Sequence, residues 1–181
     1  MTKTVLPLSE RIAFRVPDLS AYDDLVRLRG DAEVMKFVSG SPQDAEAVWY
    51  RLLRSMGHWE AFGYGYWMLH DRETNAFLGE AGIAHFRRLI VPPLPDVPEA
   101  GWMLLPSAWG RGLATEAMRA IIAWADDHVD YQEMVSIYAP EHTASIRVGE
   151  KCGFQFERKA LYREDEITVM RRSRGATGGS A

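Results

Sequence analysis

Cysteine is nearly absent from this chain of 181 residues, in which Cys152 is the only one. A single thiol excludes an internal disulfide and a metal site built from several cysteines, so we expect Cys152 to pack in the interior. Long apolar runs are also missing, and the first residues, MTKTVLPLSERIAF, lack the charged head, apolar centre and small-residue cleavage site of a secretory signal. These absences favour a cytoplasmic protein without a membrane partner.

The chain also lacks a large excess of charge of either sign, since its formal net charge is only −4. This weakly acidic balance argues against nucleic acid as the main partner and is compatible with a cationic substrate. The 47% of apolar residues suffice for the core of one domain, which we place at residues 1–172. Residues 173–181 contain no apolar side chain larger than alanine, and we expect them to form a disordered tail.

The periodicity of apolar residues predicts a mixed α/β fold. Helices are expected to start at Ser20 and at Ser41 with Pro42, and two more to cover 113–125 and 143–153. The run VPPLPDVPEA holds four prolines and is expected to be a stiff loop. The strand–helix–strand unit at 99–139 should add a parallel crossover to an antiparallel group, giving a mostly antiparallel sheet of about seven strands flanked by helices. These strands are expected at 10–17, 64–71, 76–88, 99–106, 133–139, 154–162 and 166–172.

The stretch PSAWGRGLATEAMRAIIAWA at 106–125 places two glycines and an arginine directly before an amphipathic helix. The first turn of a helix leaves backbone N–H groups unpaired, and glycines allow the backbone to approach an anion closely, so this turn is a candidate phosphate site. A tight loop whose glycines only supply unusual backbone angles is the alternative. The acidic run from Asp126 to Asp130 is interpreted as a solvated helix end, and no metal site is predicted.

Four blocks, taken in order, resemble the GNAT superfamily of acyl-CoA-dependent N-acetyltransferases, in particular its RimJ/RimL-like branch, which acetylates ribosomal-protein N-termini. The blocks are SERIAFRVPDLSAYDD, GYGYWMLHDRETNAFLGEAGI, EAGWMLLPSAWGRGLATEAM and HTASIRVGEKCGF. The superfamily signature falls on Trp109 to Ala114, where Gly112 and Ala114 match and Trp109 replaces the usual Arg or Gln. The resemblance implies acetyl-CoA as co-substrate, with its pyrophosphate on the backbone of Trp109, Gly110, Arg111, Gly112, Leu113, Ala114 and Thr115. Arg111 adds a charge-assisted contact or is a solvated surface arginine.

The resemblance also implies where the acetyl group is handled. Backbone N–H groups of Met103, Leu104 and Leu105 would polarise the thioester carbonyl. Glu99 is the candidate general base for the amine, with a solvated surface charge as the alternative. In the branch an Asn and a Ser three residues apart contact the pantetheine and approach the sulfur, and this chain has His142 and Ser145 at those places.

Several roles near the cofactor's sulfur stay open. Ser145 is the preferred general acid, whereas His142 is an alternative acid, a helix cap or a solvated residue. Tyr138 is a further acid candidate, although a tyrosine in a strand usually belongs to the core. The aromatic residues Trp59, Tyr64, Tyr66 and Trp67 are expected to be mainly core, with one of them facing the acceptor.

The leading hypothesis is therefore an acetyl-CoA-dependent N-acetyltransferase that modifies a primary amine, such as a protein N-terminal α-amine. An enzyme for a small amine (an antibiotic, a polyamine or an amino-acid derivative) and a non-catalytic acyl-CoA-binding module are the alternatives. The resemblance adds the expectation of a homodimer.

Overall fold

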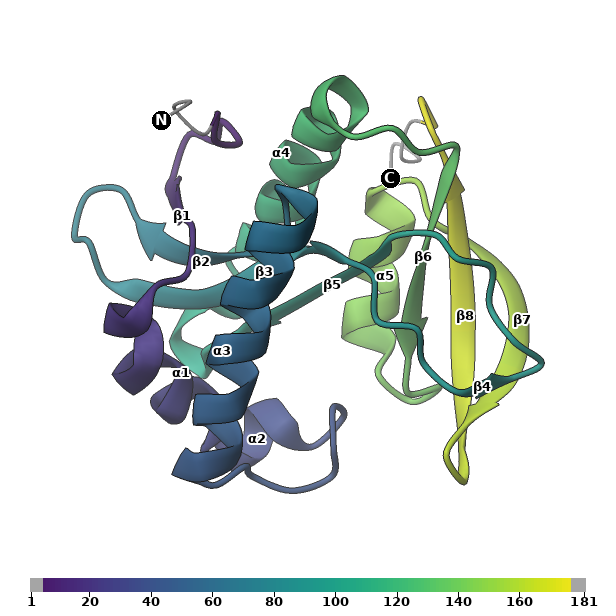
Figure 1. Ribbon diagram of the computed structural model, residues 1–181, viewed down its shortest axis with the longest axis horizontal. Helices are drawn as coiled ribbons and strands as arrows, with labels where there is room; N and C mark the ends of the chain where they lie inside the picture. Colours follow the sequence, from purple (N-terminus) through teal and green to yellow (C-terminus); the bar gives the residue numbers. More distant parts are fainter. Residues whose placement is uncertain (1–4, 177–181) are drawn as a thin grey trace.

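The computed structural model describes residues 5–176, which form one eight-stranded sheet with helices on both faces (Figure 1). The strands lie side by side in the order β1-β2-β3-β5-β6-β8-β7-β4. The predicted α/β class is thereby confirmed, with one strand more than expected. The strands are β1 (Ile12–Arg15), β2 (Tyr66–Asp71), β3 (Phe77–Ala84), β4 (Ile90–Val91), β5 (Glu99–Leu104), β6 (Glu133–Tyr138), β7 (Gln155–Tyr162) and β8 (Asp165–Ser173).

Five α-helices accompany the described part of the sheet, and two of them bear out the periodicity of the sequence. α4 begins where predicted. The six apolar residues that recur at helical spacing along it are all buried, namely Leu113, Ala117, Met118, Ile121, Ile122 and Ala125. α5 stops before Gly153, whose φ of 88° lies in the left-handed region that a glycine tolerates. No helix among residues 5–176 is long and apolar enough to cross a membrane. The helices are α1 (Tyr22–Arg29), α2 (Ala32–Met35), α3 (Ala45–Phe62), α4 (Leu113–His128) and α5 (Thr143–Lys151).

The pairing of the strands opens the sheet at its centre. Among the described strands, β5 and β6 are the one parallel pair, and Glu99 opposite Val135 is their single register position. β5 pairs with β3 along its full length, and β6 pairs with β8 along its full length. Because each strand follows its outer neighbour, β5 and β6 diverge beyond Glu99.

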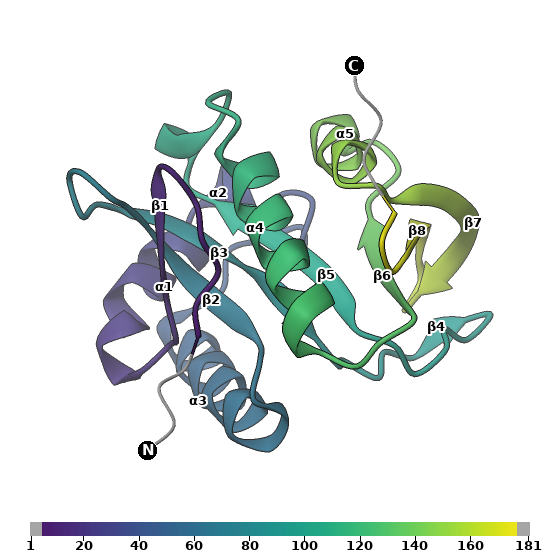
Figure 2. The same cartoon turned by 90° about the horizontal axis from the view of Figure 1, so that it is seen from above.

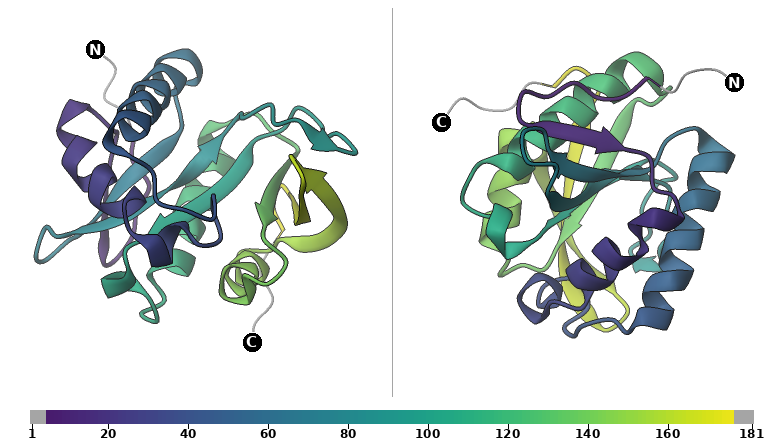
Figure 3. Two further views of the ribbon diagram at one scale, coloured as in Figure 1. Left: turned by 90° about the horizontal axis from the view of Figure 1, so that it is seen from below. Right: turned by 90° about the vertical axis from the view of Figure 1, so that its left-hand side faces the viewer.

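The two faces of the sheet carry different helices. Figures 2 and 3 show α4 and α5 on one face and α1 and α3 on the other. Trp67 of β2 packs in the core beneath α4, whereas the next residue, Met68, packs with Leu25 and Leu52 of α1 and α3. Successive side chains of a strand point to opposite faces, so each strand contributes to both cores.

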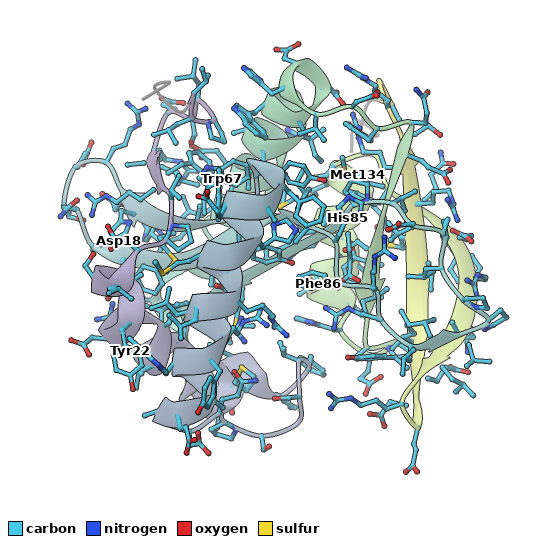
Figure 4. The ribbon with its side chains drawn as sticks, viewed as in Figure 1. Asp18, Tyr22, Trp67, His85, Phe86 and Met134 are labelled. Carbon is cyan, nitrogen blue, oxygen red and sulfur yellow. The ribbon has the colours of Figure 1, made fainter. Side chains whose placement is uncertain are left out.

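Two predicted helix starts are wrong. The carboxylate of Asp18 accepts a hydrogen bond from the N–H of Ser20 (2.8 Å), so a short 3-10 turn at Leu19–Ala21 precedes α1 (Figure 4). The carboxylate of Asp44 accepts from the N–H of Ala47 (2.7 Å) and starts α3, which leaves Ser41 and Pro42 in the loop before it. Aspartate caps a helix as well as serine does: Asp44 caps α3, and Asp18 caps the 3-10 turn that leads into α1.

Two short elements were not predicted, and the tail falls partly outside the description. α2 is a single turn capped by Asp31, and β4 pairs with β7 directly before the prolines, so that it includes the first residue of the predicted loop, Val91. β8 extends to Ser173, and the N–H of Arg174 donates to the carbonyl of Gln132 (2.8 Å). The predicted tail otherwise includes residues 177–181, which lie outside the described residues.

Candidate active site

The divergence of β5 from β6 directs part of the backbone of β5 into the space between them. The N–H of Leu105 donates to the carbonyl of Leu78 on β3 (2.8 Å), and N–H groups alternate in direction along a strand. Met103 therefore faces β3 as Leu105 does, whereas Leu104 faces β6. Of the three predicted residues, Leu104 alone directs its N–H toward the diverging edge.

The glycine turn after β5 has the backbone geometry that an anion site needs. Gly110 and Gly112 have φ values of 70° and 76°, and Gly112 is the N-terminal cap of α4. A Cβ at Gly110 would meet nothing within 4 Å, and one at Gly112 would meet the guanidinium of Arg11 at 3.8 Å. The turn is therefore open on its outer side, and its glycines serve the backbone conformation and access to it.

The acidic side chain in the first turn of α4 is neutralised by a partner, so it does not repel an anion at the glycine turn. Glu116, in the first turn of α4, accepts hydrogen bonds from the backbone N–H of Arg11 (2.9 Å) and from its Nε (2.6 Å). Although partial burial opposes it, hydrogen bonds from Ser9 and Arg11 hold the pKa of Glu116 below its usual range. Arg111 is half exposed and lies 3.7 Å from Asp71, so its guanidinium is free to reorient toward an anion.

The remaining predicted cofactor residues support the turn. The Nε1–H of Trp109 donates to the carbonyl of Leu104 (2.8 Å) and thus ties the turn to the diverging end of β5. Leu113 is buried in the core, whereas Ala114 and Thr115 are half-buried in the first turn of α4. The backbone of 109–115 therefore lies on α4's side of the sheet, beside the edge where Leu104 faces β6.

Glu99 is a buried, paired carboxylate and not the solvated charge that was its alternative. It is 6% exposed, and Arg88 donates to both of its oxygens over 2.8–3.0 Å. The Arg88 guanidinium lies 4.5 Å from the ring centre of Phe86 and 5.2 Å from that of Tyr162. Burial opposes the charge, but the hydrogen bonds and charge of Glu99 raise the pKa of Arg88, so that Arg88 stays protonated.

His142 and Ser145 both lie at the start of α5. His142 occupies the cap position, but its side chain makes no capping hydrogen bond. Its ring stacks on Phe37, from the loop after α2, with ring centres 4.3 Å apart. Burial lowers the pKa of His142 below its ordinary value, although Glu141 opposes the shift. Ser145 is half-buried one turn into the helix.

Tyr138 ends β6 on the face of α4 and α5. Its hydroxyl is buried, and no hydrogen-bond partner for it lies among the described residues. Burial raises the pKa of this hydroxyl, so it is protonated at neutral pH. Its ring centre lies 5.8 Å from that of Trp102 on β5, which places the two aromatic side chains across the diverging strands.

The opposite face of the sheet holds an open cavity beside α3. Of the four aromatic residues expected to be core or acceptor-facing, Tyr66 lines this cavity, while Trp59, Tyr64 and Trp67 are buried. The Tyr66 hydroxyl covers Gly101 so closely that a Cβ there would collide with it. Figure 4 shows His85 and Phe86 between α3 and the C-terminal strands.

A second open cavity adjoins the first. His85 and Phe86 line both cavities, and the second also contains Arg88 and Glu99 in its wall. The cavity beside α3 therefore continues to the candidate base. Sequence reasoning missed Arg51 and Arg54 in the wall of the first cavity, although two arginines three residues apart on a predicted helix share a face.

This arrangement is that of an acyltransferase: a central pair of strands diverges, with a glycine turn on one face and a cavity on the other. The sequence profile of the family described as "Acetyltransferase (GNAT) domain" matches residues 11–155. The chain belongs to this family, and the predicted class, an N-acetyltransferase, is confirmed.

The chain is similar to several bacterial proteins over most of its length. It is 29% identical over 153 residues to "Uncharacterized protein YkkB" of Bacillus subtilis, which covers 80% of this chain and 81% of that protein. A structure described as a GnaT-family acetyltransferase from Bordetella pertussis is 25% identical, with a TM-score of 0.82 and coverage of 93% and 99% of the two chains. An acetyltransferase from Agrobacterium tumefaciens is 27% identical, with a TM-score of 0.78 and coverage of 94% and 96%.

More distant structures share the fold. RimL, described as a ribosomal alpha-N-protein acetyltransferase in complex with coenzyme A, is 16% identical, with a TM-score of 0.75 and coverage of 93% and 97%. A spermidine N-acetyltransferase from Vibrio cholerae, in complex with coenzyme A and spermine, is 13% identical, with a TM-score of 0.72 and coverage of 92% and 97%. Acetyl-CoA, the predicted co-substrate, is the acetyl donor of this class. The acceptors of these two proteins differ, so the fold does not identify the acceptor.

Proposed function

We propose that this chain transfers the acetyl group of acetyl-CoA to the α-amine of a protein or peptide N-terminus, as the RimJ/RimL-like branch does. The observation that carries the choice of amine is the pairing of both Glu99 oxygens with Arg88. Because both oxygens of Glu99 already accept hydrogen bonds from Arg88, an acceptor that loses its proton easily in solution suits this site best. An α-amine has a pKa of about 7.7–8.0 against about 10.4 for lysine, a difference of roughly 3.5 kcal/mol at neutral pH.

The residues on the face of α4 and α5 fit acetyl-CoA. The open backbone at 109–115 would hold the pyrophosphate, and Arg111 would turn from Asp71 toward it. Leu104 would donate its N–H to the carbonyl oxygen as negative charge develops there. Bound acetyl-CoA supplies an activated acyl group and a thiol leaving group. Ser145 and His142, at the start of α5, are the candidates to return a proton to that leaving group.

The amine would arrive from the other face of the sheet. Glu99, Gly101 and Met103 alternate along β5 with Ala100, Trp102 and Leu104, so they face the side of α3. Glu99 lines the second cavity, which adjoins the cavity beside α3. In this proposal Glu99 takes the amine proton, directly or through one water, while the acyl group is held on the opposite face.

Charge at position 112 is expected to control affinity for coenzyme A. Gly112→Asp places a carboxylate at the cap of α4, where it repels the pyrophosphate and occupies the amide groups that would bind it. We expect calorimetry to show affinity lower by at least about tenfold.

The matched control is Gly112→Asn, which has nearly the same shape without the charge. Asparagine tolerates the left-handed backbone better than most residues, so it tests the strain alone. Equal affinity of the aspartate and asparagine variants for coenzyme A would contradict binding of the pyrophosphate at this turn.

The proposed acceptor is tested with one peptide in two blocked forms. In the first form the α-amine is free and the only lysine is acetylated, and in the second form the α-amine is acetylated and the lysine is free. Thiol release from acetyl-CoA at pH 7 should be faster with the free α-amine. Faster release with the free lysine would contradict the proposed acceptor and would still leave the chain an N-acetyltransferase.

A further inference from the structure

The cavity beside α3 has a surplus of positive charge, although the chain as a whole is acidic. Its charged side chains are Arg51, Arg54 and Glu80. Glu80 is already paired, because the fully buried Arg29 donates to it from below the cavity. Burial opposes the charge of Glu80, but Arg29 and then Arg51 lower its pKa, so the pair is ionised and cancels. The positive charges of Arg51 and Arg54 are therefore left as the surplus.

Neither arginine donates a hydrogen bond to a carboxylate of the cavity wall. Arg51 approaches the Glu80 oxygen that Arg29 already occupies, at 3.6 Å, which is longer than a hydrogen bond. Within residues 5–176 no carboxylate lies within ion-pair distance of Arg54. Partial burial, and after it the positive charges of Arg51 and Arg88, lower the pKa of Arg54. Like charges crowded at a cavity mouth are stabilised by an anion placed between them.

His58, in the wall of this cavity, does not add to the positive charge. The Nε2 of His58 accepts a hydrogen bond from the backbone N–H of His85 (3.0 Å), so it carries no proton. Its Nδ1 lies 2.8 Å from the carbonyl of Tyr64, which requires the proton to be on Nδ1. His58 is therefore neutral, in agreement with burial lowering its pKa. His85 turns its Nδ1 toward Asp96 (3.2 Å).

We infer that this cavity receives an acid group of the acceptor, and that the preferred substrates are amines which also carry a carboxylate. Arg54 and Arg51 would bind the acid, while the cavity's continuation past Phe86 leads the amine to Glu99. Guanidinium groups bind carboxylates through charge-assisted hydrogen bonds, and Tyr66 and Phe86 supply an apolar wall for the carbon chain between the two groups.

This inference rests on the proposed acetyl transfer and is tested by pairs of amines with the full chain. One arm compares peptides that have aspartate or asparagine at the second position. The other arm compares aminoalkanoic acids of increasing length with their amides. Rates of thiol release are expressed per concentration of neutral amine, because the acid group also changes the pKa of the amine.

The wild-type protein should prefer the acid member of at least one arm by about 10- to 100-fold in kcat/KM. Arg54→Gln should reduce this preference severalfold or more through KM, leave the rate with the amide member nearly unchanged, and leave coenzyme A affinity unchanged. Arg54→Lys should retain part of the preference. Lys159→Gln removes a positive charge from an exposed hairpin residue and should change nothing.

The arm that shows the preference identifies the source of the acid, a peptide or a small amino acid. Acetylation of both members at equal rates overturns the inference, as does a preference that survives in Arg54→Gln. Thiol release with none of the amines, despite binding of acetyl-CoA, would instead contradict the proposed transfer itself.

Discussion

Replacing Glu99 by glutamine is expected to lower kcat by about 10²- to 10⁴-fold at pH 6.5, the loss typical for a general base. The carboxylate faces the side of α3 and not the cofactor face, so the affinity for acetyl-CoA should stay within about twofold, well under 1 kcal/mol. The deficit should shrink as pH rises from 6 to 9, because an amine that deprotonates in solution no longer needs the base. Turnover with saturating acetyl-CoA, measured against pH, tests this.

Glu99→Gln also leaves the charge of Arg88 without its partner, so a control must separate this effect from the loss of the base. A half-buried guanidinium without its carboxylate destabilises the fold, so the thermal midpoint of each variant is measured beside turnover. Arg88→Gln removes the same ion pair but keeps the carboxylate. If the pair is only structural, both variants should lose activity equally and without pH dependence. Full activity of Glu99→Gln across pH 6–9 would also contradict the role as base.

The fold was largely predictable because local patterns and tertiary packing agree for the long elements. The apolar period of 113–125 fits a helix, and every residue of that stripe is buried. β4 was not predictable, since Ile90 and Val91 form a strand only by pairing with Leu161 and Tyr162, some 70 residues away. Pro92 and Pro93 directly after that pair indicate a loop, and nothing local distinguishes the two residues from it.

The candidate site was predictable where it depends on backbone. The glycine turn can be recognised from the sequence because left-handed backbone angles favour glycine, and Gly110 and Gly112 have them. The acceptor face was not predictable. Arg51 and Arg54 read as solvated residues of an amphipathic helix until β2 and β3 bring Tyr66 and Glu80 beneath them. The pairing of Arg88 with Glu99 spans the proline-rich loop, whose path the sequence does not define.

Losing the general acid should have the second large effect, and Ser145 and His142 compete for that role. If Ser145 protonates the leaving thiolate, Ser145→Ala should lower kcat by about 10²- to 10⁴-fold, or less where water replaces the hydroxyl. His142→Asn should then be nearly silent, because asparagine keeps a donor at the start of α5. We expect this result, since the ring of His142 is already engaged with Phe37.

The pH dependence of kcat separates the two residues. An acid must carry its proton, so if His142 were the acid, the rate would fall as pH rises through its pKa. Burial lowers that pKa from 6.5, so the fall would lie below pH 6.5 and little activity would remain at neutral pH. His142→Asn would then abolish both the limb and most of the turnover. Phe37→Leu serves as the control, because it removes the stacked ring and keeps the imidazole. An active Ser145→Ala beside an inactive His142→Asn would assign the proton to His142.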